Sequence, residues 1–446
     1  MKYSLKAAVL ATAVVLSLPL KSVLAQGSER RALPLAEAVQ LALATSKDLK
    51  ASMAAQGVAR AKVAQAKNGI LPTVAINSTF TRLSDNITPF RVRLPEREIT
   101  LNPQILNQSY NNFQVRQVLW AGGKVRNGIA AAGRAEAAAR AETDQYRLAA
   151  ADNVTTIWYT LYTLNASEGL IEQNIQLLRA RRRDLTNLER QGLVLKVDGL
   201  KLDLAVSQLE SSLVDLRSSR AINSFDLALA TGLPPTTEFI IDAELPARPP
   251  LPPLGELLTE AGAGRSELKA LGLRREAAVL DQKIVRAGVM PTLAFGGNVD
   301  YNRPNQRVFP SEAAFKGTSS VFASLNFDIG GLYTNRAQVA ESRYRLEQLN
   351  ANIEQAQEGV QRDVNANYQA YVQATDKIRV AEQALGPATE NFRVEQNRLK
   401  ANVTTPTDFL AANTQLLQAQ LDLRTAQANA ALAYSKLLKS TGRQAQ

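Results

Sequence analysis

Two aspartates, Asp198 and Asp408, are the side chains whose spacing first suggests chemistry, because they stand 210 residues apart at equivalent places of a repeated sequence. Each lies in the first turn of a predicted helix, where the positive end of the helix dipole stabilises a carboxylate. Carboxylates can also bind cations or move protons. Two interpretations of the pair therefore stand side by side: a functional site, or two helix caps.

Composition excludes most other chemistry. The 446 residues contain no His and no Cys, which rules out Ser-His-Asp and Cys-His nucleophiles, the usual zinc sites and disulfides. A faint phosphate-loop pattern at Ala261–Arg265 lacks the Lys-Ser/Thr ending and falls within a predicted helix. We expect no enzyme, no cofactor and no metal site, with a carboxylate pair inside a helical bundle as the remaining alternative.

The first residues are typical of a secretory signal peptide, predicted over residues 1–25. Lys2 and Lys6 precede the apolar stretch Ala7–Leu20, and Ala25 is a small residue suited to cleavage. No Cys follows to accept a lipid, so we expect an exported chain that is not lipidated. The alternative is a cytosolic protein with an apolar leader.

The net charge is mild for this length. It is +11 over the whole chain and is spread along it, with Arg181–Arg183 as the only tight cluster. A solvated helix face explains that cluster, whereas nucleic-acid binding requires basic residues gathered on one face. We therefore expect no nucleic-acid partner.

The sequence consists of two related halves. An offset of 219 residues pairs Gly69 with Gly288 and Pro72 with Pro291, and the offset of 210 pairs the two aspartates. A repeat of this length indicates internal duplication of one large unit. The predicted organisation is a first repeat at residues 26–232, a Pro-rich linker at 233–253, a second repeat at 254–442 and a tail at 443–446.

Six stretches rich in good helix formers are predicted to be helical. They cover Pro34–Gly69, Lys124–Gln191, Asp198–Thr231, Leu254–Gly288, Tyr333–Lys400 and Pro406–Thr441. At a rise of ~1.5 Å per residue the longest would reach roughly 100 Å, so it must lie along partners.

A heptad pattern runs through the predicted returning helices. Apolar residues alternate in steps of four and three at Leu202, Val206, Leu209, Leu213 and Leu216. Their repeat-mates begin at Ala412 and include more alanine, which allows closer helix approach. The pattern predicts antiparallel coiled coils. Pro387 should kink the second very long helix.

Four segments between the helices alternate apolar and polar residues with period two. They are predicted strands at Thr73–Arg82, Tyr110–Trp120, Thr292–Tyr301 and Ser319–Asp328. This length and pattern are typical of transmembrane barrel strands, and the alternative is a half-buried soluble sheet packed on helices. Four strands cannot close a barrel with a lumen, so the barrel interpretation requires several copies of the chain.

Small motifs recur in the same order in both halves. Leu71-Pro72-Thr73 and Met290-Pro291-Thr292 lead into strands, Gly122-Gly123 and Gly330-Gly331 follow strands, and Gly232 and Gly442 end helices. On these motifs the chain resembles the TolC-like outer membrane efflux proteins, the outer membrane factors of tripartite efflux and type I secretion systems.

The resemblance implies an α+β membrane protein. Three chains would form a homotrimer with a 12-stranded transmembrane β-barrel in the outer membrane of a Gram-negative bacterium and a long α-helical coiled-coil tunnel in the periplasm. Its partners would be a periplasmic adaptor (membrane fusion) protein, an inner-membrane pump and outer membrane lipid. Passage would be passive, for small molecules or proteins.

The resemblance also implies two sites. Adaptors of this family dock at the turns between the long helices, which fall here on Gly192, Leu193 and Val194, and on Ala401, Asn402 and Val403. Carboxylates narrow the tunnel just inside the last helix, which makes Asp198 and Asp408 the expected periplasmic gate. The family's second carboxylate falls on Ala411, so the constriction is expected to be less acidic.

Two competing functions use the same features differently. A periplasmic adaptor also carries coiled-coil hairpins, but around a compact β-domain and without duplicated hairpin strands. A structural coiled-coil protein would not need alternating strands. In the resembled family, cargo specificity lies mostly in the pump, so the sequence predicts no particular drug, metal, peptide or toxin.

Overall fold

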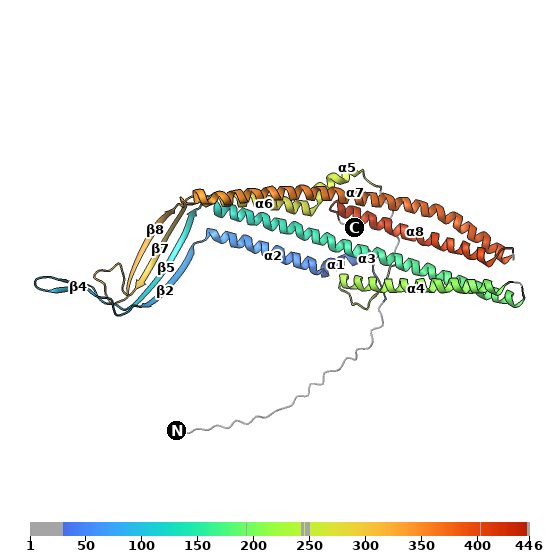
Figure 1. Ribbon diagram of the computed structural model, residues 1–446, viewed down its shortest axis with the longest axis horizontal. Helices are drawn as coiled ribbons and strands as arrows, with labels where there is room; N and C mark the ends of the chain where they lie inside the picture. The colour runs from blue at the N-terminus through green and yellow to red at the C-terminus, as the bar shows by residue number, and fades with distance from the viewer. Residues whose placement is uncertain (1–29, 193, 242–244, 246–249, 402, 444–446) are drawn as a thin grey trace, which may run out of the picture.

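The computed structural model describes residues 30–192, 194–241, 245, 250–401 and 403–443. In this part of the chain, very long helices lie side by side and continue at one end into a β-sheet (Figure 1). The predicted signal peptide, Leu193, Asn402 and most of the Pro-rich stretch lie outside the described residues.

Two helices run most of the length of the molecule. They are α3 (Lys124–Arg190) and α7 (Gly331–Lys400), of 67 and 70 residues. The helices α4 (Lys196–Thr231) and α8 (Pro406–Ser440) return along them. Pro387 does not interrupt α7, which remains one helix and curves over its C-terminal half (Figure 1). No helix in the described part of the chain combines the length and apolar character needed to cross a membrane.

The two shorter predicted helices are each broken once. The first consists of α1 (Leu35–Thr45) and α2 (Lys47–Lys67), and the second of α5 (Leu254–Gly264) and α6 (Ser266–Arg286). Ser46 causes the first break, because its hydroxyl accepts a hydrogen bond from the Leu49 N–H at 3.2 Å and caps α2. Short 3-10 turns, η1 (Asn68–Ile70) and η2 (Ala287–Val289), then lead into the sheet.

The predicted heptad forms the seams between the long helices. Leu202 and Leu213 of α4 are buried against Leu178 and Ile175 of α3. In α8 the corresponding seam is built from buried alanines, namely Ala412, Ala419 and Ala426. The smaller residues fit the expectation that this second pair approaches more closely.

The four predicted strands form one antiparallel sheet. Its order is β2 (Thr73–Arg82), β5 (Asn107–Trp120), β7 (Thr292–Asn302) and β8 (Lys316–Asn326). Both β5 and β8 begin three residues earlier than predicted. In the described residues β2 pairs only with β5 and β8 only with β7, so each outer edge of the sheet is unpaired.

Four further short strands were not predicted. The parallel pair is β1 (Arg30–Ala32) with β6 (Glu238–Ile240), which places a strand inside the segment expected to be a plain linker. The antiparallel pair is β3 (Phe90–Arg93) with β4 (Glu98–Asn102), in the connection between β2 and β5. Their three to five residues are too few for an alternating pattern to be visible in the sequence.

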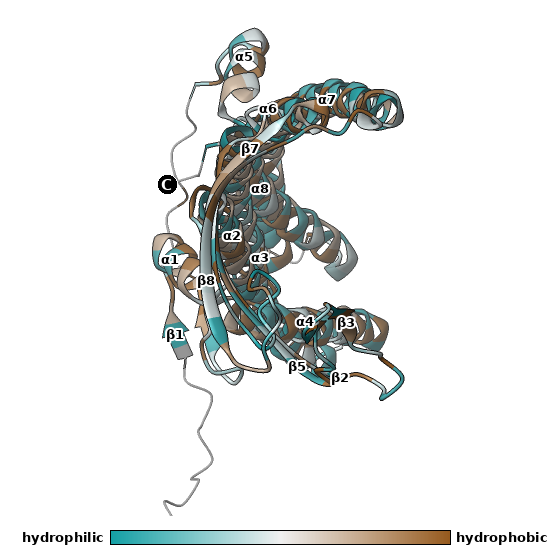
Figure 2. Cartoon of the chain, turned by 90° about the vertical axis from the view of Figure 1, so that its left-hand side faces the viewer, coloured by the Kyte–Doolittle hydropathy of each residue, from teal (hydrophilic) through white to brown (hydrophobic). Residues whose placement is uncertain are grey.

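The two faces of the main sheet differ in chemistry. One face carries exposed apolar side chains, with Ile76 74% and Val321 79% accessible. The other is polar: Asn112 Nδ2 donates to Asp300 Oδ1 at 2.8 Å, and Ser320 Oγ is 2.6 Å from Asn298 Oδ1. Viewed from its end, the sheet is strongly curved, and the helices behind it follow an arc (Figure 2).

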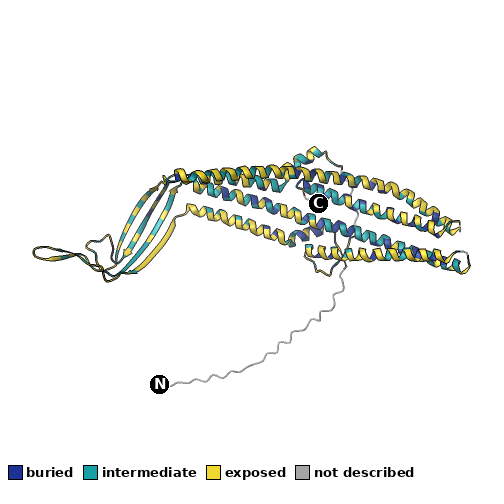
Figure 3. Cartoon of the chain, in the orientation of Figure 1, coloured by how far each residue is buried: buried dark blue, intermediate teal, exposed yellow. Residues whose placement is uncertain are grey.

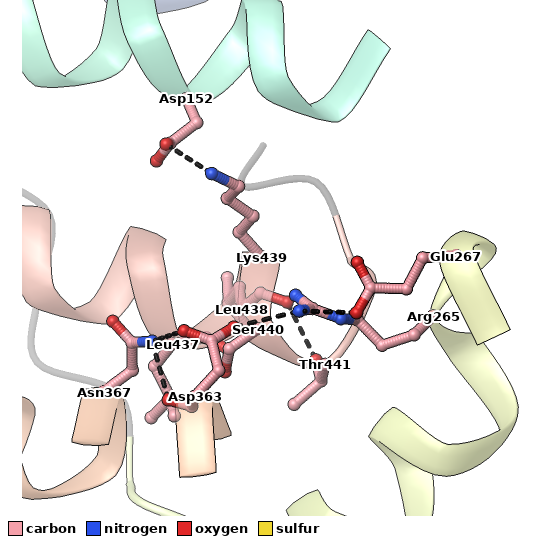
Figure 4. A network of polar contacts seen from close by, with 10 residues as sticks. All are labelled: Asp152, Arg265, Glu267, Asp363, Asn367, Leu437, Leu438, Lys439, Ser440 and Thr441. Atoms are coloured by element: carbon pink, nitrogen blue, oxygen red, sulfur yellow. Dashed lines mark hydrogen bonds and ion pairs between the residues drawn. The ribbon is translucent and has the colours of Figure 1, made fainter. Parts of the chain in front are cut away.

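Polar contacts fasten the middle of the molecule. Lys439, in the last turn of α8, donates from Nζ to Asp152 Oδ2 of α3 at 2.6 Å (Figure 4). Arg265, at the break between α5 and α6, lies 3.0 Å from Asp363 Oδ2 of α7. Nearby, Trp158 Nε1 donates to the Leu33 carbonyl at 2.8 Å within the largest apolar cluster of the described residues. These contacts hold the helices together near the middle of the molecule, and the turns between the long helices lie beyond them.

Candidate functional site

The turn between α3 and α4 lies at the end of the molecule opposite the sheet (Figure 1). Gly192 has φ +73°, a left-handed conformation that glycine adopts without strain. Val194 packs against an apolar cluster between the helices, whereas Gly192 and Leu195 are exposed. Val194 thus holds the turn from inside, and Gly192 and Leu195 lie on its outer side.

The turn between α7 and α8 is closed by a capping interaction. Thr405 Oγ1 donates to Asp408 Oδ2 at 2.7 Å, and the Asp408 N–H donates to Thr405 Oγ1 at 3.2 Å. The second of these bonds is the N-cap hydrogen bond of α8. The Thr405 hydrogen bonds are the main cause that holds the pKa of Asp408 below its usual range, and Thr404 and Arg398 contribute. Asp408 is therefore an exposed, ionised carboxylate that also caps α8.

A buried carboxylate stabilises the same turn. Glu395 is 9% exposed. It accepts hydrogen bonds from Thr404 Oγ1 and from Arg398 Nη1, both at 2.7 Å. These bonds tie the last turns of α7 to the residues that open α8, so the exposed Val403 is presented on a rigid support.

Lys201 connects the two turns. Its Nζ lies 3.8 Å from Asp198 Oδ1 and donates to Thr407 Oγ1 at 2.8 Å. Thr407 is adjacent to Asp408 in the chain, so the structure places both predicted aspartates at the same end of the molecule. The two differ in environment, because the Asp198 side chain is only 17% exposed whereas Asp408 is exposed.

Phe409 anchors α8 to the other helix pair. It is fully buried, packs with Leu178, Leu185 and Leu202 of α3 and α4, and has its ring 5.7 Å from that of Phe392. Its repeat-mate is Gly199. A Cβ at Gly199 would lie 2.8 Å from the Arg182 guanidinium, so the absence of a side chain leaves room for Arg182. Sequence reasoning missed this difference, although the Gly/Phe pair is visible in the repeat.

A groove of about 740 Å³ runs between α7 and α8 beside the second turn. Its walls include Ala384 and Ala388 of α7, and Leu410, Ala411 and Thr414 of α8. The groove exists because the side chains on both helices are small there. Ala411 is the position at which the resemblance places a second carboxylate. Within the described residues, no three His, Cys, Asp or Glu side chains are grouped as a metal site would require.

Comparison with protein families gives one match that spans both halves. The family model described as "Outer membrane efflux protein" matches residues 38–233 and 257–443. No curated protein matches the sequence.

Solved structures of low sequence identity share the fold. The outer membrane protein VceC of Vibrio cholerae superposes with a TM-score of 0.75 at 19% identity, covering 92% of this chain and 96% of that one. The MtrE outer membrane channel of Neisseria gonorrhoeae gives 0.73 at 18% identity, covering 92% and 89%. CusC, described in terms of transmembrane channel formation, gives 0.77 at 13% identity, covering 92% of each chain.

Proposed function

The chain belongs to the outer membrane efflux protein family, and we propose that three copies form a channel-tunnel through which an export system releases its cargo from a Gram-negative cell. The main support is the sheet, whose strands β2 and β8 each have an unpaired edge in the described structure. Four strands are too few to enclose a lumen, whereas three copies of this sheet would supply twelve.

The two faces of the sheet suit a membrane barrel. The exposed apolar side chains, such as Ile76 and Val321, would face lipid. The polar face, with Asn112, Asp300 and Ser320, would line a water-filled lumen. The curvature of the sheet has the sense that closure with two further copies requires (Figure 2).

Exposed apolar residues on α4 support association of the helical part. Large side chains are accessible along the helix at Leu200, Leu204, Val214, Ile222, Phe225 and Leu229. Figure 3 shows the exposed positions along α4, at one edge of the helix layer. A neighbouring copy would bury this stripe and continue the layer into a tunnel in the periplasm.

The proposal also gives a role to each remaining part of the chain. Residues 1–25 act as a signal peptide, and the mature chain carries no lipid. Residues 26–232 and 254–442 are the two repeats of an internal duplication, joined by 233–253. Passage through the tunnel is passive and needs no cofactor.

Asp198 and Asp408 form the periplasmic gate in this proposal. In a trimer, three copies of each would surround one axis at the tip, where like charges repel most strongly when water is scarce. The Lys201 ammonium, 3.8 Å from Asp198, offsets part of this repulsion. Bound cations would offset the rest.

The two turns form the docking tip for a periplasmic adaptor, which connects the channel to an inner-membrane pump. The docking residues are Gly192, Leu193, Val194, Ala401, Asn402 and Val403. The exposure of Gly192 and Val403 supports this role. The groove beside Ala411 offers an adjoining surface into which an adaptor helix could pack.

Conductance of the purified protein tests this function. Full-length protein, extracted from outer membranes with detergent, is added to planar lipid bilayers. We expect discrete channel openings, and a gel mobility that shifts on heating because a closed barrel resists denaturation. A protein that leaves the membrane without detergent and never conducts would instead support the periplasmic adaptor interpretation.

A further inference from the structure

A group of unpaired cations lies where the helices meet the sheet. Each of the four helices that join the sheet carries at least one within ten residues of a strand end. The set comprises Lys67 of α2, Lys124 and Arg126 of α3, Lys283 and Arg286 of α6, and Arg336 of α7. Figure 1 shows these four helix ends side by side next to the strands. We refer to the six residues as the basic collar.

The collar gathers several cations without a charged partner in a short stretch of the molecule. Each of its six side chains is exposed, and none makes a hydrogen bond or ion pair with another described residue. Elsewhere many arginines are neutralised, as in Arg179 with Glu210 and Arg134 with Glu276. The same short helix ends contain only two carboxylates, Asp281 and Asp328. An excess of unneutralised cations at one level is a surface for anions.

Exposed apolar residues lie beside the collar, at the boundary between the helices and the strands. At this boundary the last residues of β5, the connections to the sheet and the first turn of α7 supply Leu119, Trp120, Leu71, Met290, Ile329 and Tyr333, each about half exposed or more. On α7, Tyr333 and Arg336 are three residues apart and therefore share a face. A sequence of apolar strand, aromatic residue and cation along one direction is the order of environments met on leaving a bilayer.

From these observations we propose that the basic collar binds the phosphate headgroups of anionic phospholipids in the inner leaflet of the outer membrane. The proposal rests on the membrane-spanning role of the sheet given above. Strands of 10 to 14 residues place their helix-side ends at one surface of the hydrocarbon layer. The cations of the collar then lie at headgroup depth, where the long Lys and Arg side chains can reach the phosphates.

The experiment measures lipid selectivity of the full-length protein. It is reconstituted into phosphatidylcholine vesicles that contain a trace of spin-labelled phosphatidylglycerol or spin-labelled phosphatidylcholine. The fraction of each label immobilised at the protein surface gives the relative association constant. We expect the parent protein to prefer phosphatidylglycerol, and the preference to fall with added salt.

Matched variants identify the residues responsible. The collar variant combines Lys67→Gln, Lys124→Gln, Arg286→Gln and Arg336→Gln, one change on each helix. The control variant combines Lys47→Gln, Lys50→Gln, Arg362→Gln and Lys377→Gln, which are exposed cations outside the collar. The collar variant should lose the preference and the control should keep it.

Three results would overturn the proposal. The parent protein could show no preference for phosphatidylglycerol, or the collar variant could keep the preference of the parent. The collar variant could also change the anion-to-cation selectivity of conductance in neutral bilayers while lipid preference is unaltered, which would place the cations in the lumen. Failure of the membrane role is distinguished by flotation, because protein that does not float with the vesicles has not inserted.

Discussion

The side-chain amides of Asn174 and Asn413 are hydrogen-bonded to each other twice, with each Nδ2 donating to the Oδ1 of the other at 3.2 and 3.0 Å. Asn174 belongs to α3 and Asn413 to α8, so the pair joins the two helical hairpins. Asn413 is 2% exposed. Asn174 is partly exposed. A polar residue in a coiled-coil seam specifies the register of its helices, and this pair ties α8 to α3.

Replacing one member of this pair should destabilise the protein. Asn174→Leu leaves the buried Asn413 amide without its partner in a low-dielectric site, which costs about 1–3 kcal/mol. The measurement is the thermal unfolding of the purified protein in detergent. Asn174→Leu combined with Asn413→Leu should recover most of the loss, because no amide is then left unpaired. A double variant that loses the sum of both single effects would contradict this account.

Removing the charges at the tip should open the gate. Asp198→Asn together with Asp408→Asn keeps side-chain size and removes the proposed rings of like charge. We expect a changed single-channel conductance in planar bilayers and weaker block by divalent cations added at the periplasmic side. Asp422→Asn, an exposed carboxylate further along α8, serves as control. If conductance and block match the parent protein, the two aspartates are helix caps and the gate lies elsewhere.

The stabilisation that the Thr405–Asp408 cap gives to α8 should be lost at low pH. Hydrogen bonds from Thr405 lower the pKa of Asp408 in the folded protein. The stabilisation is therefore present above the unfolded pKa, near 3.9, and is lost as pH falls through the lower folded pKa. The protection of the amides of residues 407–409 against hydrogen exchange, relative to the intrinsic rate at the same pH, should decrease below about pH 4. Thr405→Val should decrease this protection at neutral pH too, and equal protection in both proteins would argue against the cap.

Changes at the docking tip should block export and leave assembly intact. Gly192→Glu with Val403→Glu adds bulk and charge at one exposed position in each turn, outside the helix seams. We expect loss of export in cells with normal amounts of assembled protein in the outer membrane. Gly192→Asn is the control, because a Cβ at Gly192 meets nothing within 4 Å and Asn tolerates a positive φ. Normal export by the double variant would place docking elsewhere.

Periodicity made much of the fold predictable. The strand Thr73–Arg82 was predicted to the residue, because alternation along a two-faced sheet leaves a strong local pattern. The break at Ser46 was missed, although a Ser three residues before Leu49 is a recognisable helix start. The β1–β6 pair was missed because three residues paired with a segment about 200 positions away leave no local signal.

The candidate site residues could be chosen from the sequence, but their contacts could not. The repeat singled out Asp198 and Asp408, and the structure adds that Lys201 contacts Asp198 and Thr407. The capping geometry of Asp408 also follows from its Thr-x-x-Asp pattern. The anchor formed by Phe409, the Glu395 network and the Asn174–Asn413 pair depend on contacts between distant helices, which periodicity does not report.

Cross-linking of the sheet edges tests the central claim most directly. The chain has no Cys, so Asn77→Cys on β2 paired in turn with Thr318→Cys, Ser320→Cys or Ser324→Cys on β8 introduces the only thiols. Because β2 and β8 are opposite edges of the sheet, a disulfide between them joins different copies. After oxidation in intact outer membranes, the account predicts a covalent trimer and no larger species for at least one pair. Monomers alone with every pair, or a ladder that continues beyond three chains, would contradict it.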